Sequence, residues 1–493
     1  MGRRRTHRYE DGASISAPVQ EPESQTPSRW PRIAGIGLLA GVLAATIGWL
    51  LYAWQKPRVL RVRVYTDYAF RLKRADWEQI VRDRIAALNE IYGPTGIRWE
   101  LRSSNQADPT SMAPGLDQRR MKLAELTGGD ADLLLGLAGS SPRGSQTASV
   151  VPFTHGAMVV DPSGEFEAAR LARELSRLFG APPESGQAKG GSLSPVAQRL
   201  IRELRTYNFE HGTEELAGDS GNRAVDAMAE AYRNIAANPE AHAHEIAATA
   251  LITEHRMQPG IAQLRQAIKL DPKNASAALT LAAALCEEND FNGAAAVLGN
   301  ATAADPGNVR LRDGAAALSA KISHQPEALL QITEMVSRNP KDAELNALLG
   351  WLFLPEAGLI MKSVAAFENA RNTDPDSPSA LRGLERADTV RVQALAEVER
   401  RREGVRQNPQ AADAHFNLGV AYMMAGGFDS AQEEFERVVS LKPTSGKAHV
   451  NLALLHWLKH DYPGAEREVA SARKAGVEPS GELVRVIKQG PGQ

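Results

Sequence analysis

The sequence of 493 residues contains a single cysteine, Cys286, which excludes an internal disulfide and any zinc site built on cysteine ligands. Aromatic residues make up only 5% of the chain, and the formal net charge is −2. A net charge so close to zero does not indicate the basic surface that nucleic-acid binding requires, so no nucleic-acid partner is expected. The thiol lies in sequence among Leu281, Leu285 and Ala294, and we expect it to be buried and inert rather than nucleophilic.

Signatures of nucleotide binding and of serine hydrolases are also missing. The sequence has no G-x-x-x-x-G-K-[ST] loop, no G-x-G-x-x-G segment after a predicted strand and no G-x-S-x-G elbow. None of the loops that cradle phosphates or present a serine nucleophile can therefore be identified. We predict no cofactor.

What the sequence has instead is a regular spacing of prolines. Successive members lie 34, 34, 35, 34 and 34 residues apart: Pro272, Pro306, Pro340, Pro375, Pro409 and Pro443. Two short antiparallel helices and their turns need about 34 residues. Because proline cannot continue a helix, each of these prolines ends one unit and begins the next.

The best-formed unit, residues 410–443, indicates how its two helices pack. Leu418 and Tyr422 lie one turn apart on the face of the first helix that must meet the second. Gly419 and Ala431 are small where the two helices would cross closely. This pattern resembles the tetratricopeptide repeat (TPR) family, whose helix pairs stack into an α-solenoid that binds other proteins or peptides.

The resemblance implies about seven TPR units over residues 223–487, a fair length for a solenoid. One unit fits the pattern poorly. In the unit that ends at Pro409, charged residues take slots that are usually apolar or small: Asp388, Glu397 and Arg401. We expect that unit to be loosely packed.

A peptide-binding groove is the candidate site of the repeats, because the resemblance implies that the first helix of each pair lines the inner surface. The expected groove residues of the last two units are Phe416, Asn417, Val420, Met423, Val450, Asn451, Leu454 and Trp457. Asn417 and Asn451 are 34 residues apart, so their amides would bind an extended peptide in register, while Met423 and Trp457 would add apolar contacts. The alternative is that the asparagines only satisfy neighbouring backbone groups.

The N-terminal region favours a single-pass membrane protein. Residues 33–54 form a run of 22 residues without a charge, enough to cross a hydrocarbon core of about 30 Å. Residues 1–32 form a basic tail, rich in serine, proline and glutamate, that we expect to be disordered. A cleaved signal peptide is the alternative. The long tail and the lack of an Ala-x-Ala site favour an uncleaved transmembrane anchor in the lipid bilayer.

The same anchor carries small residues at intervals of four, Gly37, Gly41 and Ala45. Such a stripe lets two membrane helices approach closely, so a homodimer through the anchor is one interpretation and a monomer is the other. Basic residues flank both ends of the span, so the positive-inside rule does not by itself decide which end is cytoplasmic. We favour a cytoplasmic N-terminus with the C-terminal domains outside the cytoplasm.

Residues 59–212 are predicted to form a second folded domain. Alternating apolar and basic residues predict a strand over 59–65, and apolar residues at helical spacing predict a helix over 77–92. Further strands are expected over 97–101, 131–137, 149–153 and 155–160, and further helices over 118–126 and 165–179. This order indicates an α/β or α+β domain, followed by a C-terminal α-solenoid in a chain that is mainly α.

The last helix of that domain carries a motif. From Ala172 it reads A-R-E-L-S-R-L-F-G-A-P-P, which resembles the zinc helix H-E-x-x-H-x-x-G-x-x-H of metzincin-type (zincin) metallopeptidases. The resemblance places Glu174 at the general base and Gly180 at the turn glycine. The three ligand positions hold Arg173, Arg177 and Pro183. Guanidinium groups have no free lone pair for a metal, so the resemblance implies a degenerate domain without zinc and without catalytic residues.

Two other interpretations of the motif remain open. The R-E-L-S-R run is also an ordinary amphipathic helix, in which case the resemblance is a coincidence. Alternatively, the protein is an active membrane-anchored zinc metalloprotease whose ligands are other residues, such as His155, His211 or Glu167. The interpretation that we favour is a membrane-anchored TPR scaffold with a pseudo-metallopeptidase domain, and not an enzyme.

Overall fold

The computed structural model describes residues 56–105, 115–126, 129–140, 148–160, 167–182, 192–209, 212–217, 219–322, 335, 338–355 and 360–489. From residue 57 onwards the chain forms one compact unit, Pro57–Gln493. The predicted tail, the predicted membrane span at residues 33–54 and its stripe Gly37, Gly41 and Ala45 lie outside the described residues. Within the described residues, no helix combines the length and the apolar character that crossing a membrane requires.

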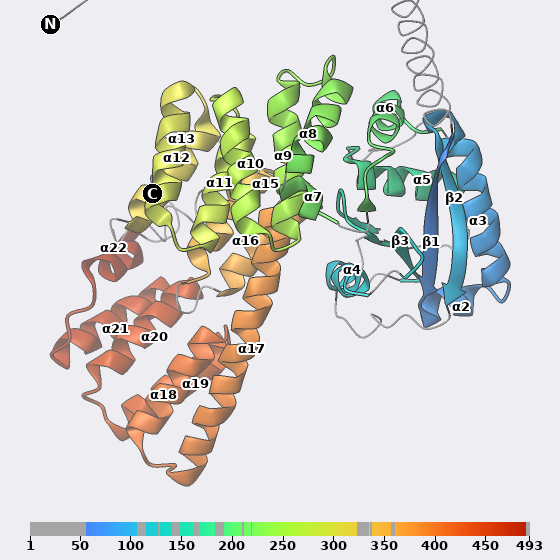
Figure 1. Cartoon of the computed structure of the whole chain (residues 1–493). Coiled ribbons are helices and arrows are strands. Elements are labelled where there is room, and N and C mark those ends of the chain that lie inside the picture. The colour runs from blue at the N-terminus through green and yellow to red at the C-terminus, as the bar shows by residue number, and fades with distance from the viewer. Residues whose placement is uncertain are drawn as a thin grey trace, which may run out of the picture. The chain divides into compact units, whose positions relative to one another are not determined.

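The N-terminal part of this unit is built on a mixed five-stranded sheet (Figure 1). Its strands are β1 (Arg58–Thr66), β2 (Ile97–Asn105), β3 (Leu133–Ala138), β4 (Ala148–Val150) and β5 (Gly156–Val160). Their order in the sheet is β2-β1-β3-β5-β4, and all neighbours are parallel except β4, which runs antiparallel to β5 and forms one edge. The strands expected from the sequence are therefore present, with bounds shifted by a few residues.

Helices cover both faces of this sheet. They are α2 (Tyr68–Lys73), α3 (Trp77–Tyr92), α4 (Leu116–Ala124), α5 (Ala168–Ser176) and α6 (Pro195–Glu203). On β3, Leu133 and Leu135 belong to the core under α3 and α5, whereas Leu134 belongs to the smaller core under α4. Because both faces are covered, the strand is a continuous apolar run, as is usual for parallel strands. The predicted helix over 77–92 is confirmed.

The C-terminal part is a succession of helix pairs. The helices are α7 (Glu214–Ala217), α8 (Asp219–Tyr232), α9 (Pro239–Thr253), α10 (Met257–Leu270), α11 (Ala275–Glu287), α12 (Phe291–Ala304), α13 (Val309–Ile322), α15 (Ala343–Phe353), α16 (Ile360–Thr373), α17 (Pro378–Gln407), α18 (Ala412–Met424), α19 (Phe428–Leu441), α20 (Gly446–Leu458), α21 (Tyr462–Lys474) and α22 (Gly481–Gln489). Each of the six regularly spaced prolines lies between two helices.

Small residues allow the paired helices to cross closely, as the sequence predicts. A Cβ added at Gly419 would lie 2.8 Å from Cε1 of Phe435, and one added at Gly350 would lie 2.6 Å from Cε1 of Phe367. Both phenylalanines are fully buried. An aromatic ring of the second helix thus fills the space that the glycine of the first helix leaves open.

The unit that ends at Pro409 is not a helix pair. It is replaced by α17, a single helix of 30 residues. Between Gly383 and Gly404 the sequence has neither glycine nor proline, so nothing stops the helix where a turn was expected. The three charged residues that fitted the repeat poorly form ion pairs along this helix: Arg391–Asp388, Arg400–Glu397 and Arg401–Glu397. Two further pairs follow, Arg402–Glu399 and Arg406–Glu403. Each such exposed pair stabilises a helix only slightly.

The first helices of the early units do not line an open groove. α11 and α15 are buried on nearly all sides and pack against each other, and α17 packs on α9. Arg382 of α17 donates from Nε to Glu287 of α11 (2.8 Å). This closed packing corrects the expectation of an inner surface available along the whole solenoid. Cys286 is buried within it, as predicted, and burial raises the pKa of its thiol.

Helix α9 contributes side chains to two hydrophobic cores, that of the sheet and that of the repeats. On α9, Ala247 and Leu251 belong to the core of the sheet, whereas Ala248 and Ile252 belong to the core of the repeats. The core of the sheet therefore continues past the expected boundary between residues 212 and 223, as far as α9. The second half of α9, residues 246–252, is apolar apart from Thr249, which is consistent with this double role.

Candidate functional site

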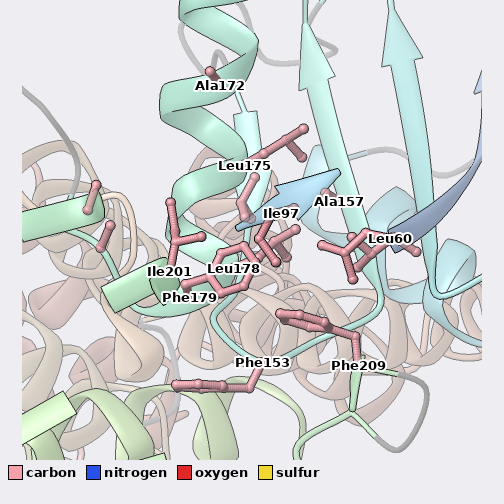
Figure 2. Close-up of a cluster of buried hydrophobic side chains, with 14 of the residues drawn as sticks. Leu60, Ile97, Phe153, Ala157, Ala172, Leu175, Leu178, Phe179, Ile201 and Phe209 are labelled. Atoms are coloured by element: carbon pink, nitrogen blue, oxygen red, sulfur yellow. The ribbon is translucent and has the colours of Figure 1, made fainter. Parts of the chain in front are cut away.

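The helix that carries the metallopeptidase-like motif packs on the sheet through one face. α5 is followed by one turn of 3-10 helix, Arg177–Phe179. Leu175, Leu178 and Phe179 point from this segment into the main core, toward Leu60 and Ile97 (Figure 2). Their burial explains the apolar positions of the motif without reference to a metal.

Gly180 ends this segment with a backbone φ of +78°. A side chain is strained in that conformation, and a Cβ would also lie 3.2 Å from Cγ2 of Ile246 and 3.3 Å from Sδ of Met228. Its carbonyl oxygen accepts a hydrogen bond from the Tyr232 hydroxyl (3.0 Å). Glycine is therefore required here for the packing of α5 against α8 and α9.

Arg177 is the motif residue with the most contacts, and all of them use it as a donor. Its side chain is buried; Nη1 donates to Oε2 of Glu174 (3.1 Å) and Nη2 donates to the Val150 carbonyl (3.3 Å). Nη2 also pairs with the carboxylate of Asp376, in the turn between α16 and α17. A guanidinium engaged in this way holds two carboxylates and cannot serve as a metal ligand.

The other motif positions are less engaged. Arg173 and Glu174 are half-buried, and among the described residues no ion pair or hydrogen bond of the Arg173 side chain is recorded. Pro183, at the third ligand position, lies outside the described residues. Glu174, at the position of the family's general base, is instead the ion-pair partner of Arg177. The motif residues are thus used for packing and for an internal charge contact.

The residues considered as alternative metal ligands do not gather. Glu167 is exposed in front of α5, and His211 lies outside the described residues. His155 lines an open cleft of about 440 Å³ that also has Glu254 and His255 on its wall. Within the described ranges, no three histidine, cysteine or acidic side chains are arranged as a metal site would need.

Asn417 and Asn451 occupy the two expected groove positions on α18 and α20. Asn417 is exposed and Asn451 is half-buried, and no hydrogen bond of either side chain is recorded within the described part of the chain. Their amide groups are therefore not engaged by a described backbone group. That these two amides bind a peptide stays a prediction.

The apolar residues expected in the groove are more enclosed. Met423 is buried, with an exposed fraction of 6%, which corrects the expectation that it offers an accessible apolar contact. Three of the others, Phe416, Val420 and Leu454, are partly buried between the helices of these units. Val450 and Trp457 are partly buried against a cluster that includes Leu483 and Ile487 of α22.

Trp457 is also covered from a second direction. The Lys362 ammonium of α16 lies 5.4 Å from the centre of its ring, within the range of a cation–π contact. Apolar packing on one side and a cation on the other leave only part of the ring available. We therefore expect Trp457 to shape the groove more than to anchor a partner.

Two contacts of this region could not be found from the motifs. Asp376 reaches Arg177 from a position 199 residues further along the chain, and Arg382 reaches Glu287 across 95 residues. Both belong to the same repeat boundary. One signal in the sequence was Asp376 itself, because none of the other five boundary prolines is followed by an aspartate.

Comparison with known families supports the repeats. Tetratricopeptide repeat models match residues 251–322 and 421–476. These segments are TPR units, and TPR units support a role in protein–protein interaction. No curated protein matches the chain in sequence.

Several solved structures resemble part of the chain. A crystal structure of MamA is 17% identical and covers 46% of this chain and 92% of its own, with a TM-score of 0.15. YrrB, described as a TPR protein with an unusual peptide-binding site, is 18% identical. The match covers 45% of this chain and 96% of YrrB, with a TM-score of 0.21. A tetratricopeptide repeat protein from Parabacteroides merdae ATCC 43184 is 14% identical. The match covers 50% of this chain and 97% of that protein, with a TM-score of 0.19. These scores are low, so the TPR assignment rests on the sequence models.

Proposed function

We propose that the protein is a membrane-anchored scaffold that binds extended segments of other proteins through α18 and α20. The observation that carries this proposal is the pair Asn417 and Asn451, which repeat at the TPR period with amides that no described group engages. Two amides in register supply donors and acceptors to the backbone of an extended peptide. The partly buried Val420 and Leu454 add apolar surface beside them.

The scaffold is attached to the membrane through residues 33–54, with the folded domains outside the cytoplasm. The support for this part of the proposal is the length and uncharged composition of that segment. The α/β part is a pseudo-metallopeptidase domain. Its support is chemical: arginine stands at two ligand positions, and Arg177 is engaged by carboxylates.

The test is capture of partners by the full chain from its native membrane. The full chain is the appropriate bait, because a fragment starting at residue 223 would separate α9 from the core of the sheet. We expect the Asn417→Ala/Asn451→Ala double variant to lose partners that the unaltered chain retains. Each lost amide contact should cost about 1 kcal/mol of binding free energy, roughly a fivefold weaker affinity.

A matched control is Asn292→Ala/Asn300→Ala, which removes two exposed amides from α12, the second helix of another unit. Partners kept by the control and lost by the groove variant support binding at α18 and α20. If both variants retain the same partners with unchanged helicity, the binding surface lies elsewhere and the proposal is wrong.

A further inference from the structure

The turn between α16 and α17 contacts the α/β part of the molecule at the motif helix. This turn is the Asp374-Pro375-Asp376 run, and it reaches the sheet domain although the two segments are far apart in sequence. Arg177, which receives Asp376, has an exposed fraction of only 8%. The guanidinium is therefore the buried side of the contact, whereas the Asp376 side chain keeps an exposed fraction of 31%.

The turn is held in a fixed shape before it reaches Arg177. Oδ1 of Asp374 accepts a hydrogen bond from the backbone N–H of Asp376 (3.1 Å), and the Asp374 carbonyl accepts one from the N–H of Ser377 (3.1 Å). The ring of Pro375 restricts the backbone between them. The Asp376 carboxylate is thus presented in one position, which lowers the entropy that the contact must overcome.

The receiving surface includes the edge of the sheet. β4 is an edge strand, yet all three of its residues are buried. Ser149 donates from its hydroxyl to Oδ1 of Asp117 (2.7 Å), and the Val150 carbonyl accepts from Arg177. Only a cavity of about 10 Å³ remains between β4 and the turn, at the lower limit for holding one water. Pro375 and Asp376 of the turn line this cavity together with residues of β4, α9 and α17, so little space is left beside the strand.

An unprotected edge strand exposes backbone groups that can pair with another chain, and proteins usually cover such edges. A buried ion pair often adds little net stability, because desolvation offsets the attraction between the charges. Its removal from one side is costly, because the remaining charge is left buried. Such a pair is therefore better suited to fixing one arrangement than to adding stability.

We propose that the Asp374–Asp376 turn is an internal clasp: by binding Arg177 it holds the repeats on the α/β part and covers the edge strand β4. On this proposal Arg177, at the second ligand position of the motif, is the receptor of the clasp. Opening the clasp exposes the backbone of β4 and the surface of α5 to other chains. The proposal does not depend on which partner the C-terminal repeats bind.

The test is hydrogen exchange of the full chain in detergent, measured over residues 148–151 and 370–378. In the Asp376→Ala and Arg177→Ala variants we expect exchange in both segments to become about tenfold faster or more, because one charge of a buried pair is left alone. The matched control is Arg173→Ala, one turn earlier on α5, where no partner of the side chain is recorded among the described residues. It should leave both segments unchanged.

A conservative variant keeps the proposal testable if Arg177→Ala fails to fold. Arg177→Lys retains the positive charge beside Glu174 and Asp376, so its exchange in both segments should be slower than that of Asp376→Ala. Unchanged exchange at residues 148–151 in a folded Asp376→Ala variant would overturn the clasp. So would equal acceleration by Arg173→Ala, because the effect would then belong to the helix and not to the contact.

Discussion

His415 and His449 lie 34 residues apart and make the same two contacts. Nδ1 of His415 is 2.6 Å from Oε2 of Glu434, and Nδ1 of His449 is 2.7 Å from Oε2 of Glu468. Nε2 of each ring faces the carbonyl oxygen of the proline six residues earlier, at 3.0 and 3.3 Å respectively. Each ring therefore joins the first helix of its unit to the second helix and to the preceding turn.

We predict that His415→Ala lowers the free energy of unfolding by about 2 kcal/mol, because it leaves a partly buried carboxylate and a carbonyl without their partner. The double variant with Glu434→Ala should show a coupling energy of about 1 kcal/mol. Chemical denaturation followed by circular dichroism measures both. The control is Glu433→Ala, at the exposed neighbouring position. An equal loss of stability in the control would show that the contact between His415 and Glu434 is not the cause.

The metal content is a second prediction. The purified full chain should carry well below one zinc per molecule and show no proteolysis that a chelator abolishes, because Arg173 and Arg177 cannot donate electrons to a metal. Changing both to histidine should restore at most weak zinc binding, since Pro183 provides no third ligand. Metal analysis that finds stoichiometric zinc of nanomolar affinity in the unaltered chain would contradict the pseudo-metallopeptidase assignment.

The charge of the clasp gives a pH-dependent prediction. Burial raises the pKa of Asp374 to about 6, helped by the nearby Asp376 and Glu344 and opposed by Arg177. Burial also raises the pKa of Asp376. Arg177 lowers that pKa, whereas the nearby carboxylates of Glu174 and Asp117 raise it. The closed form thus binds protons more tightly than a solvated one. The stability that protonated Asp374 adds to the closed form is complete below pH 3.8, the ordinary pKa of aspartate. It is lost as the pH rises through about 6, where Asp374 ionises in the closed form.

Asp374→Asn removes the buried charge while its side-chain oxygen can still accept the hydrogen bond from Asp376. We therefore expect this variant to be more stable than the unaltered chain at pH 8, by on the order of 2 kcal/mol, and to show a smaller change between pH 4.5 and 8. Urea unfolding at the two pH values measures the difference. The same pH dependence in both proteins would show that Asp374 is not the responsible group.

Close helix crossing provides a prediction with an internal control. Gly419→Ala places a Cβ against the buried ring of Phe435 and should destabilise the chain by about 1–3 kcal/mol. Gly404→Ala, inside α17 with no atom within 4 Å of the added Cβ, should instead stabilise it by about 0.5–1 kcal/mol. Thermal unfolding of the two variants should shift in opposite directions. Shifts of the same sign would mean that the crossing is looser than described.

The membrane segment gives the last prediction, which concerns residues outside those described. If Gly37, Gly41 and Ala45 form a contact between two anchors, Gly41→Ile should reduce self-association of the isolated segment in micelles. Leu38→Ile, next to the stripe but not part of it, is the control and should leave self-association unchanged. An unaltered dimer fraction in Gly41→Ile, or an unaltered segment that is already monomeric, would contradict a homodimer formed through this stripe.

Local interactions account for what the sequence made predictable. The prolines at the turns and the close helix crossing at Gly419 depend on residues within one unit, so a period of 34 is enough to find them. That the ring of Phe435 fills the space at Gly419 was seen only in the structure. The continuous helix α17 could have been anticipated, because the sequence between Gly383 and Gly404 contains no residue that stops a helix. Contacts such as Arg177 with Asp376 could not, because they depend on how the repeats close on the sheet.

α17 also has a mechanical consequence. Its 30 residues extend for about 45 Å, and its first half is packed with the early units while Val398, in its second half, packs with Leu418 of α18 (Figure 1). A jointed helix pair would absorb a pull on the last units by bending at its turn. A single helix without a joint transmits the pull along its axis, so tension from a partner held by α18 and α20 reaches the segment that begins at the Asp374–Asp376 turn.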